Sequence, residues 1–306
     1  MTETSSGEAV GTPHAFTPPQ RRSKEISLEE AGALIAQRTR LAFGNEPMAL
    51  VRAAIRAGAK DLTVIPPVTT SLSTDLLIAA GAVDTLYVCY IGFETLGMAP
   101  AFRRAAESNA LNIVEADEIA VILGTRTAAG GMPFAPVKNI YEATDLPRLN
   151  PNLKRVVDPF TGEEMTAIPA LRSEICLIHA QEADVYGNAV CVGSNNQEAD
   201  KALASDFVIV QADRIVSTER IKEQPYRTTL PSNLVHAVVH APFGAHPLVS
   251  GRQYQMDVPH VRTYLDMVKA GKAAEYLERY VYGPENEWEY LDAIGARNLL
   301  ALQRNI

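Results

Sequence analysis

Short apolar runs alternate with amphipathic stretches along most of the chain. Four runs have the length and apolar character of buried strands: DLTVIPPV (61–68), TLYVCYIGF (85–93), LNIVEA (111–116) and EICLIHAQEA (174–183). The segments between them, such as 74–82 and 99–108, have helical spacing. Strands that alternate with helices form a mostly parallel sheet covered by helices on its faces. The pattern therefore predicts an α/β fold with an open, layered α/β/α arrangement.

The alternation continues on both sides of this region. Near the start, Ser27 followed by Glu30 is a capping-box pattern that opens a helix. A strand over 39–44 and a second helix over 46–58, which ends in glycine, come next. Later in the chain we expect a strand over 188–194, a helix over 196–205, strands over 206–216 and 233–242, and amphipathic helices over 258–283 and 285–303.

The domain organisation follows from where this pattern stops. Residues 1–25 are rich in Ser, Thr, Gly, Pro and Gln, a composition that buries too little surface to offset its ordering entropy, so a disordered tail is expected there. The pattern crosses residue 150 without a break, which predicts one domain over 26–306. The proline-rich segment 145–166 is expected to leave the sheet.

Charge and composition exclude several classes of protein. The chain has 36 acidic against 28 basic residues and no basic stripe, so nucleic acid is not an expected partner. No apolar run approaches the roughly 20 residues needed to span a bilayer, so no membrane segment is expected. Three scattered cysteines argue against a disulfide framework and favour the reducing cytoplasm.

Known cofactor and metal motifs are missing from the sequence. The dinucleotide, P-loop and hydrolase-elbow patterns do not occur, and the glycine pair of AAGGMPF (128–134) is interpreted as a helix stop. His236, His240 and His246 have a spacing that zinc ligands can show, but the first two lie on an expected strand rather than a helix. All three are interpreted as hydrogen-bonded structural residues, as is His179. Neither a cofactor nor a metal site is predicted.

One acidic run has two interpretations. VEADEIAVILG (114–124) gathers three acids ahead of an apolar run, so Asp117 could cap a helix that begins at Glu118 and buries Ile119, Ile122 and Leu123. Negative charge at a helix start contributes about 0.3–1 kcal/mol, which would account for the acids. Alternatively, Glu118 is catalytic, because ligands of parallel α/β sheets bind in the loops that follow the strands.

Four further segments carry a family resemblance: AVVHAPFGAHPLVSGRQYQMD (237–257), HAQEADVYGNA (179–189), GGMPFAPV (130–137) and EYLDAIGARNLLAL (289–302). With them the chain, from about residue 26 onward, resembles the α-type subunit of family I CoA-transferases, most closely the glutaconate CoA-transferase A subunit. It is also similar to the A chain of the two-subunit hydrolase that opens a CoA-thioester ring in steroid degradation. The resemblance implies the CoA-transferase fold.

The resemblance also implies an assembly and a mechanism. A β-type subunit is expected as partner in a heterodimer or an α2β2 tetramer. That partner would supply a glutamate that attacks the acyl-CoA and passes through an anhydride to a glutamyl-CoA thioester. Coenzyme A would be a substrate rather than a bound cofactor, and acyl-CoA and organic acids the other substrates. This chain would shape the acyl pocket at the subunit boundary.

The resemblance implies roles for individual residues of this chain, and some of these residues differ from those of the related enzymes. Glu94, with the adjoining Gly92 and Phe93, is implied to line the acyl substrate, although the glutaconate enzyme has serine where Glu94 stands. Glu118 matches the acid that activates water in the ring-opening hydrolase. Lys138 replaces an arginine near that hydrolase's site, and a point ammonium does not reproduce a bidentate fork. The loop AFGNEPMAL (42–50) is shorter than the family's glycine-rich loop.

Three functions follow as hypotheses. The first is a subunit of a CoA-transferase that acts on an acyl-CoA and a small organic acid. The second is a hydrolase of the same assembly in which Glu118 orients water. The third is a non-catalytic acyl-CoA or organic-acid sensor with the same fold.

Overall fold

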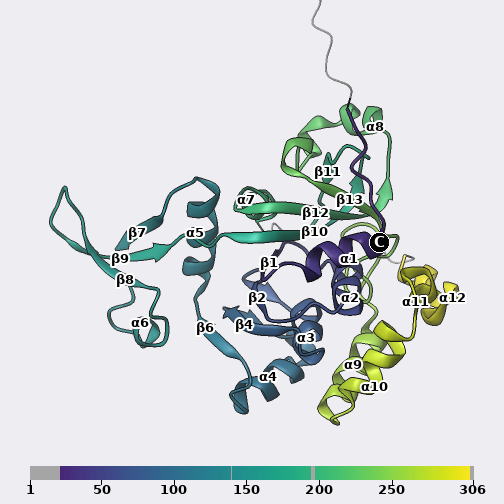
Figure 1. Ribbon diagram of the computed structural model, residues 1–306, viewed down its shortest axis with the longest axis horizontal. Helices are drawn as coiled ribbons and strands as arrows, with labels where there is room; N and C mark the ends of the chain where they lie inside the picture. Colours follow the sequence, from purple (N-terminus) through teal and green to yellow (C-terminus); the bar gives the residue numbers. More distant parts are fainter. Residues whose placement is uncertain (1–20, 139, 194–196, 304–306) are drawn as a thin grey trace, which may run out of the picture.

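A mostly parallel sheet forms the centre of the molecule. The computed structural model describes residues 21–138, 140–193 and 197–303. The strands are ordered β13-β12-β10-β1-β2-β4-β6 and all run parallel, while the short β11 pairs antiparallel with β10 (Figure 1). This confirms the predicted fold class. The strands are β1 (Arg40–Phe43), β2 (Leu62–Ile65), β4 (Val83–Val88), β6 (Asn112–Glu115), β10 (Ser173–Ala183), β11 (Ala189–Val190), β12 (Ser205–Ile215) and β13 (Ala237–His240).

Each face of the sheet has its own core because successive strand residues point to opposite sides. On β1, Leu41 and Phe43 belong to the larger core, whereas Ala42 belongs to the second. The larger core is covered by helices from both ends of the chain, and Figure 1 shows them beside the sheet. They are α1 (Leu28–Ala36), α2 (Met48–Arg56), α3 (Leu72–Ala79), α4 (Pro100–Glu107), α9 (Val258–Lys269), α10 (Ala273–Leu277), α11 (Glu287–Ile294) and α12 (Ala296–Leu302).

The first two helices illustrate how local sequence determines the packing. The capping box of α1 is present, because Glu30 N donates to Ser27 Oγ and Ser27 N donates to the Glu30 carboxylate. Gly32 brings α1 against α2, since a Cβ there would lie 2.6 Å from the carbonyl oxygen of Ala53. Any side chain at position 32 would push the two helices apart.

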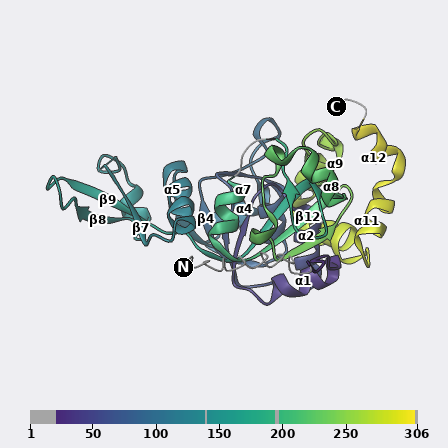
Figure 2. The same cartoon turned by 90° about the horizontal axis from the view of Figure 1, so that it is seen from above.

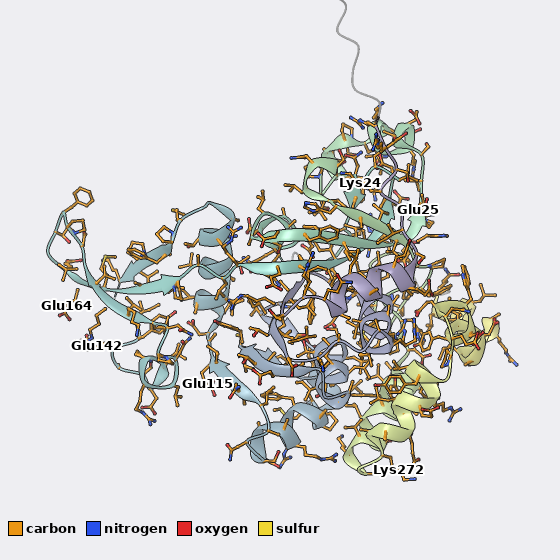
Figure 3. The ribbon with its side chains drawn as sticks, viewed as in Figure 1. Lys24, Glu25, Glu115, Glu142, Glu164 and Lys272 are labelled. Atoms are coloured by element: carbon orange, nitrogen blue, oxygen red, sulfur yellow. The ribbon has the colours of Figure 1, made fainter. Side chains whose placement is uncertain are left out.

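The proline-rich excursion is a small antiparallel sheet that projects from the body. Its strands are β7 (Phe134–Lys138), β9 (Glu164–Pro169) and β8 (Lys154–Val157), in that order, with α6 (Leu146–Leu149) before β8. Figures 1 and 2 show this arm extending away from the main sheet, and Figure 3 places Glu142 and Glu164 on it. The predicted departure from the main sheet is correct.

Helix α5 (Glu118–Ala129) connects β6 to the arm, and its capping was predicted correctly. The Asp117 side chain accepts from Ala120 N at 2.8 Å and from the Tyr141 hydroxyl at 2.8 Å. The predicted apolar face was wrong at Ile119, which is 40% exposed, whereas Ile122 and Leu123 are half-buried. The arm and the body contact the opposite side of the helix, where small residues allow close approach: Ala120, Val121, Gly124, Thr125, Thr127 and Ala128 are buried.

The N-terminal segment joins the sheet earlier than the predicted tail boundary at residue 25. Residues 1–20 of that tail lie outside the described part of the chain. Lys24 Nζ donates to the carbonyl oxygens of Ser232 and Val235, and Glu25 pairs with Val238 of β13 (Figure 3). The chain is therefore attached to the sheet before residue 26.

Several predicted elements differ in extent, and the helix expected over 258–283 is divided into α9, α10 and a π-helical turn, Glu278–Tyr282. The strand expected over 188–194 is only the two-residue β11, which turns back along β10, and residue 194 lies outside the described residues. The helix expected over 196–205 is α7 (Glu198–Leu203), and residue 196 is likewise not described. Among the helices that are described, none has both the length and the apolar character needed to cross a bilayer.

Candidate functional site at the carboxyl edge of the sheet

The strand order reverses direction at β1. From β1 the chain adds β2, β4 and β6 on one side, and then β10, β12 and β13 on the other. In open parallel sheets, the crevice at the carboxyl ends of the strands beside such a reversal is where ligands bind. The segment Gly44–Asn45–Glu46 leaves β1 at this position.

Glu46 is held firmly at the edge of this crevice. The Ser71 backbone N–H and hydroxyl donate to Glu46 Oε1, both at 3.0 Å, and Ser73 N donates to Oε2 at 3.2 Å. Burial raises the pKa of Glu46, and the bonds from Ser71 and Ser73 offset only part of this rise. Sequence reasoning noted the short loop but not Glu46. The place of Glu46 in the fold depends on the order of the strands, which the sequence does not reveal. A carboxylate directly after the first strand could nevertheless have marked Glu46 as a candidate site residue.

A pocket of about 440 Å³ opens beside Glu46. It lies between β3 (Thr69–Thr70), the turn that follows β5 (Tyr90–Ile91), and the first turn of α9. One part of its wall is apolar, and the other carries two carboxylates and one guanidinium. The lining residues are Glu46, Thr69, Thr70, Ser71, Gly92, Phe93, Glu94, Thr95, Leu96, Met256, Val258 and Arg262.

The turn over 92–98 brings the predicted substrate residues into this wall. Gly92 pairs with Met98, and Phe93 N donates to the Gly97 carbonyl at 2.8 Å. Gly92 lies directly against Tyr90, whose hydroxyl would be 2.5 Å from a Cβ at position 92. The turn places Glu94 at φ 48°, in the left-handed region that favours glycine. Gly92, Phe93 and Glu94 thus lie together in the pocket wall, and their role in substrate binding stays a prediction.

We predict that glycine is better tolerated than alanine at position 94. Glu94 is exposed, so both changes lose little packing, but only glycine avoids the steric penalty of the left-handed conformation. Glu94→Gly should be about 1 kcal/mol more stable than Glu94→Ala. Urea unfolding of the two variants measures the difference. At Arg126, within α5, the order should reverse, because glycine weakens a right-handed helix; the same order at both positions would contradict the prediction.

Glu118 lies at the same edge of the sheet, one strand further along. Glu118 is exposed in the first turn of α5. Two residues before it, the backbone N–H of Ala116 donates to the carbonyl of Val88, the last residue of β4. Cys89 follows directly, and its pKa is raised by burial and by the nearby charges of Glu118 and Asp117. Glu118 does not line the 440 Å³ pocket. Its catalytic role stays a prediction that depends on what a partner would add at this edge.

Lys138 lies elsewhere. It is the exposed last residue of β7, paired through its backbone register with Met165, and so belongs to the projecting arm. It is not among the lining residues of the pocket. The structure therefore joins Gly92, Phe93 and Glu94 in one wall but does not bring Lys138 into it.

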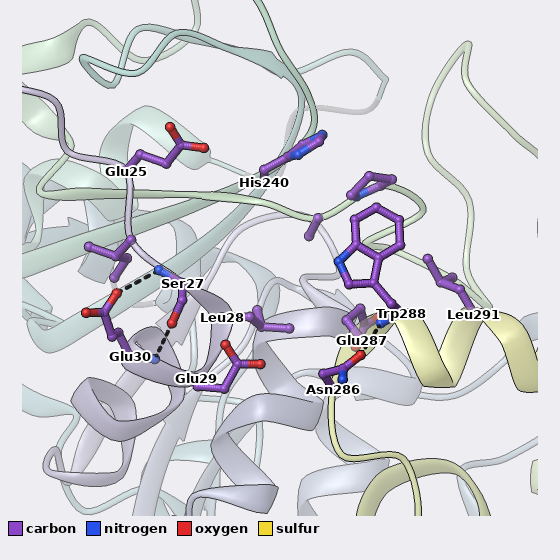
Figure 4. A pocket seen from close by; sticks show the side chains of 13 residues that line it. Glu25, Ser27, Leu28, Glu29, Glu30, His240, Asn286, Glu287, Trp288 and Leu291 are labelled. Atoms are coloured by element: carbon purple, nitrogen blue, oxygen red, sulfur yellow. Dashed lines mark hydrogen bonds between the residues drawn. The ribbon is translucent and has the colours of Figure 1, made fainter.

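A second, larger pocket of about 590 Å³ lies at the far end of the sheet, where β13 meets α1 and α11 (Figure 4). Its polar groups serve the helices themselves: Glu30 closes the α1 capping box, and Asn286 accepts from Trp288 N at the start of α11. Its other charged groups are mostly acidic, with Glu25 and Glu29 labelled in Figure 4. An acidic wall would repel the phosphates of a nucleotide-bearing substrate.

The buried histidines have structural partners, as expected. His179 lies within hydrogen-bond distance of Ser250 Oγ (3.0 Å) and Gln211 Nε2 (2.9 Å), while His246 contacts the Tyr290 hydroxyl (2.6 Å) and Asp257 (3.1 Å). Within the described ranges, no group of three His, Cys, Asp or Glu side chains is arranged to hold a metal ion.

Comparison with known proteins identifies the family. The model of the coenzyme A transferase family matches residues 26–241, which is most of the chain. The chain belongs to the coenzyme A transferase family. The A subunit of a 3-oxoadipate CoA-transferase from Pseudomonas knackmussii is 32% identical over 248 residues, covering 80% of this chain and 86% of that protein.

Other relatives show the range of the family. The cholesterol ring-cleaving hydrolase IpdA subunit of Rhodococcus jostii is 30% identical over 288 residues, covering 88% of this chain and 95% of that protein. An Archaeoglobus fulgidus protein whose name assigns no function is 36% identical over 262 residues, which cover 85% of this chain. The match spans only 58% of the length of that archaeal relative.

Solved structures agree with this assignment. Glutaconate coenzyme A-transferase from Acidaminococcus fermentans superposes with a TM-score of 0.84 at 27% identity, over 92% of this chain and 95% of that chain. A variant of the decarboxylase AibA/AibB superposes with a TM-score of 0.75 at 31% identity, and the match covers 85% of this chain and 98% of that chain. The predicted family is confirmed: the chain is an α-type subunit of a CoA-transferase-type enzyme.

Proposed function

We propose that this chain shapes the acyl pocket of a heteromeric enzyme that moves CoA from an acyl-CoA to a small organic acid. The observation that carries the proposal is the 440 Å³ pocket beside the reversal of strand order at β1, in a chain of the CoA-transferase family. Its apolar wall, formed by Phe93, Leu96 and Met256, suits a hydrocarbon chain. Relatives named as A subunits support a partner of the β type.

The reaction divides between the two subunits. A glutamate of the β-type partner attacks the thioester carbonyl and expels CoA thiolate, which leaves an acyl anhydride. The thiolate then attacks the glutamyl carbonyl of the anhydride and releases the acyl group as a carboxylate, so that CoA is held on the enzyme. This chain orients the acyl group and excludes water. Glu46 is a poor nucleophile here, because both of its oxygens accept hydrogen bonds.

The test compares the isolated chain with its complex. The chain is expressed alone and together with a candidate β-type partner, such as the product of an adjacent reading frame that encodes one, and CoA transfer is measured. Borohydride reduction after incubation with acyl-CoA marks the glutamyl thioester, and mass spectrometry locates it. We expect transfer only from the complex, with the mark on the partner. Transfer by the isolated chain, or a mark at Glu46, Glu94 or Glu118, would reject the proposal.

Hydrolysis is the second candidate, and the position of Glu118 favours it. The carboxylate of Glu118 is exposed at the start of α5, where it could orient water at the edge of the sheet. In addition, the match to the ring-cleaving hydrolase subunit covers nearly the full length of that subunit. Glu118→Gln should then lower hydrolysis about 100-fold, the scale typical of a lost general base. Glu115→Gln is the matched control, because Glu115 is an exposed acid three residues away (Figure 3). Unchanged hydrolysis in Glu118→Gln would exclude this role.

A further inference from the structure

We propose that Glu46 makes the acyl pocket selective for acyl groups without a second carboxylate. This deepens the proposed function and rests on it. The substrate class would be thioesters of short monocarboxylic acids, whose hydrocarbon end meets the apolar wall. Thioesters of dicarboxylic acids would be disfavoured, because their distal carboxylate would approach Glu46 and Glu94.

Glu46 already fills the position at which this pocket could hold a ligand carboxylate. The N–H groups at the start of a helix have no partner within the helix, and such helix ends bind carboxylates. In this chain the Ser71 and Ser73 backbone N–H groups both donate to Glu46. The Ser71 hydroxyl, which stands at the N-cap position of α3, also donates to Glu46. The donors that would recognise a distal carboxylate are therefore occupied by the protein itself.

The remaining charges around the pocket do not reverse this preference. Lys201, the cation near Glu46, is buried and donates to the carbonyl of Phe43 at 2.8 Å, and it does not line the pocket. The charge of Glu198 interacts with that of Lys201, and Glu198 does not line the pocket either. Glu94 brings a second carboxylate into the pocket wall. Arg262 is the one cation among the described residues that line the pocket, and it is exposed.

The hydrogen bonds from α3 oppose the effect of burial on Glu46. Burial raises the pKa of Glu46 and so favours its neutral form, whereas the bonds donated by Ser71 and Ser73 stabilise the carboxylate. A second carboxylate brought beside this carboxylate would meet a like charge. The opposite wall offers Phe93, Leu96, Met256 and Val258, which favour a methyl terminus.

The test uses two ligands that differ by one group. Glutaryl-CoA is butyryl-CoA with a carboxylate added to the end of its chain. Isothermal titration of both into the complex with a β-type partner whose nucleophilic glutamate is replaced by alanine gives the two affinities without covalent reaction. The wild-type complex should bind butyryl-CoA at least tenfold more tightly. Glu46→Ala should reduce this preference at least tenfold, because it removes the like charge and frees the α3 donors.

Two further variants test the assignment to Glu46. Glu94→Gln removes the other carboxylate but leaves the α3 donors occupied, so it should change the preference less than Glu46→Ala. Glu46→Gln keeps the shape of the side chain and should shift the preference in the same direction as alanine. If the wild type binds glutaryl-CoA as tightly as butyryl-CoA, and Arg262→Gln abolishes that binding, Arg262 receives the carboxylate and the proposal is wrong.

The titration is independent of turnover. Selective binding without CoA transfer would reject the proposed function and leave the role of Glu46 standing. Transfer with equal affinity for the two thioesters would reject the role of Glu46 alone.

Discussion

Arg52→Ala is expected to lower the free energy of unfolding by about 3–5 kcal/mol, the range found when one partner of a buried ion pair is removed. Arg52 is 2% exposed and joins α2 to the C-terminal helices. Its guanidinium donates to both carboxylate oxygens of Glu287 and to the His246 carbonyl at 2.9 Å, and it stacks on the Tyr290 ring at 3.8 Å. Alanine would leave the buried carboxylate of Glu287 almost uncompensated, because the other ion pair that it forms within the described part of the chain is the long one with Arg56, at 3.9 Å.

Urea unfolding followed by circular dichroism measures this loss. Arg103→Ala is the control, because Arg103 forms an ion pair with Glu107 on the exposed side of α4, where such pairs contribute little. Arg52→Lys should recover only part of the stability, since an ammonium cannot donate to Glu287 and His246 with the same geometry. Equal stabilities of Arg52→Ala and Arg103→Ala would show that this buried network does not hold the C-terminal helices.

The sequence predicted the parts of the fold that local patterns determine. Apolar strands between helices identified the parallel sheet, and the pairs Ser27–Glu30 and Asp117–Ala120 follow from capping rules within four residues. The predicted apolar face of α5 was wrong at Ile119, because burial on this helix depends on what the arm packs against, which no local pattern contains. Glu46 was missed for the same reason: Ser71 and Ser73 reach it only once β1 and β2 lie side by side.

The fold brings some of the predicted site residues together and separates others. The stretch from Gly92 to Glu94 was identified by resemblance alone, and the fold places all three residues in one pocket wall. Glu118 and Lys138 came from a second resemblance, to the hydrolase, and the fold separates them: one begins α5 at the sheet edge and the other ends β7 on the arm. If both act in one site, a partner subunit must complete it.

The burial of His260 should make acidification from pH 7 to pH 5 destabilising through this residue, above the pH at which ordinary carboxylates titrate. His260 is 8% exposed, lies 2.9 Å from the Tyr276 hydroxyl and contacts the Tyr280 ring. Burial, followed by the charge of His246, lowers the pKa of His260 to about 3. Burial also lowers the pKa of His246, although its bond to Asp257 opposes the change. Both imidazoles are therefore neutral in the folded chain at pH values where the unfolded chain has protonated them.

The sign and the pH range follow from linkage. A histidine whose pKa is lower when folded contributes its full stability above the unfolded pKa of about 6.5 and loses it as the pH falls toward the folded value. For His260 the loss is about 1.4 kcal/mol per pH unit, or about 2 kcal/mol between pH 7 and pH 5, and His246 adds to it. The pKa of Asp257 is lowered, since the bonds from His246 and the His260 N–H outweigh its burial. The contribution of Asp257 is thus lost only below about pH 4.

Unfolding free energies at pH 7 and pH 5 measure this slope directly. His260→Gln keeps a polar group for Tyr276 but cannot be protonated, so its stability should fall by about 2 kcal/mol less than that of the wild type over this range. His240→Gln is the control, because His240 is exposed at the end of β13, and its slope should equal that of the wild type. The comparison uses the change in unfolding free energy between pH 7 and pH 5, so a loss of stability that is the same at both pH values does not affect it. If His260→Gln and the wild type lose the same stability between pH 7 and pH 5, His260 is protonated in the folded chain and its burial does not keep it neutral.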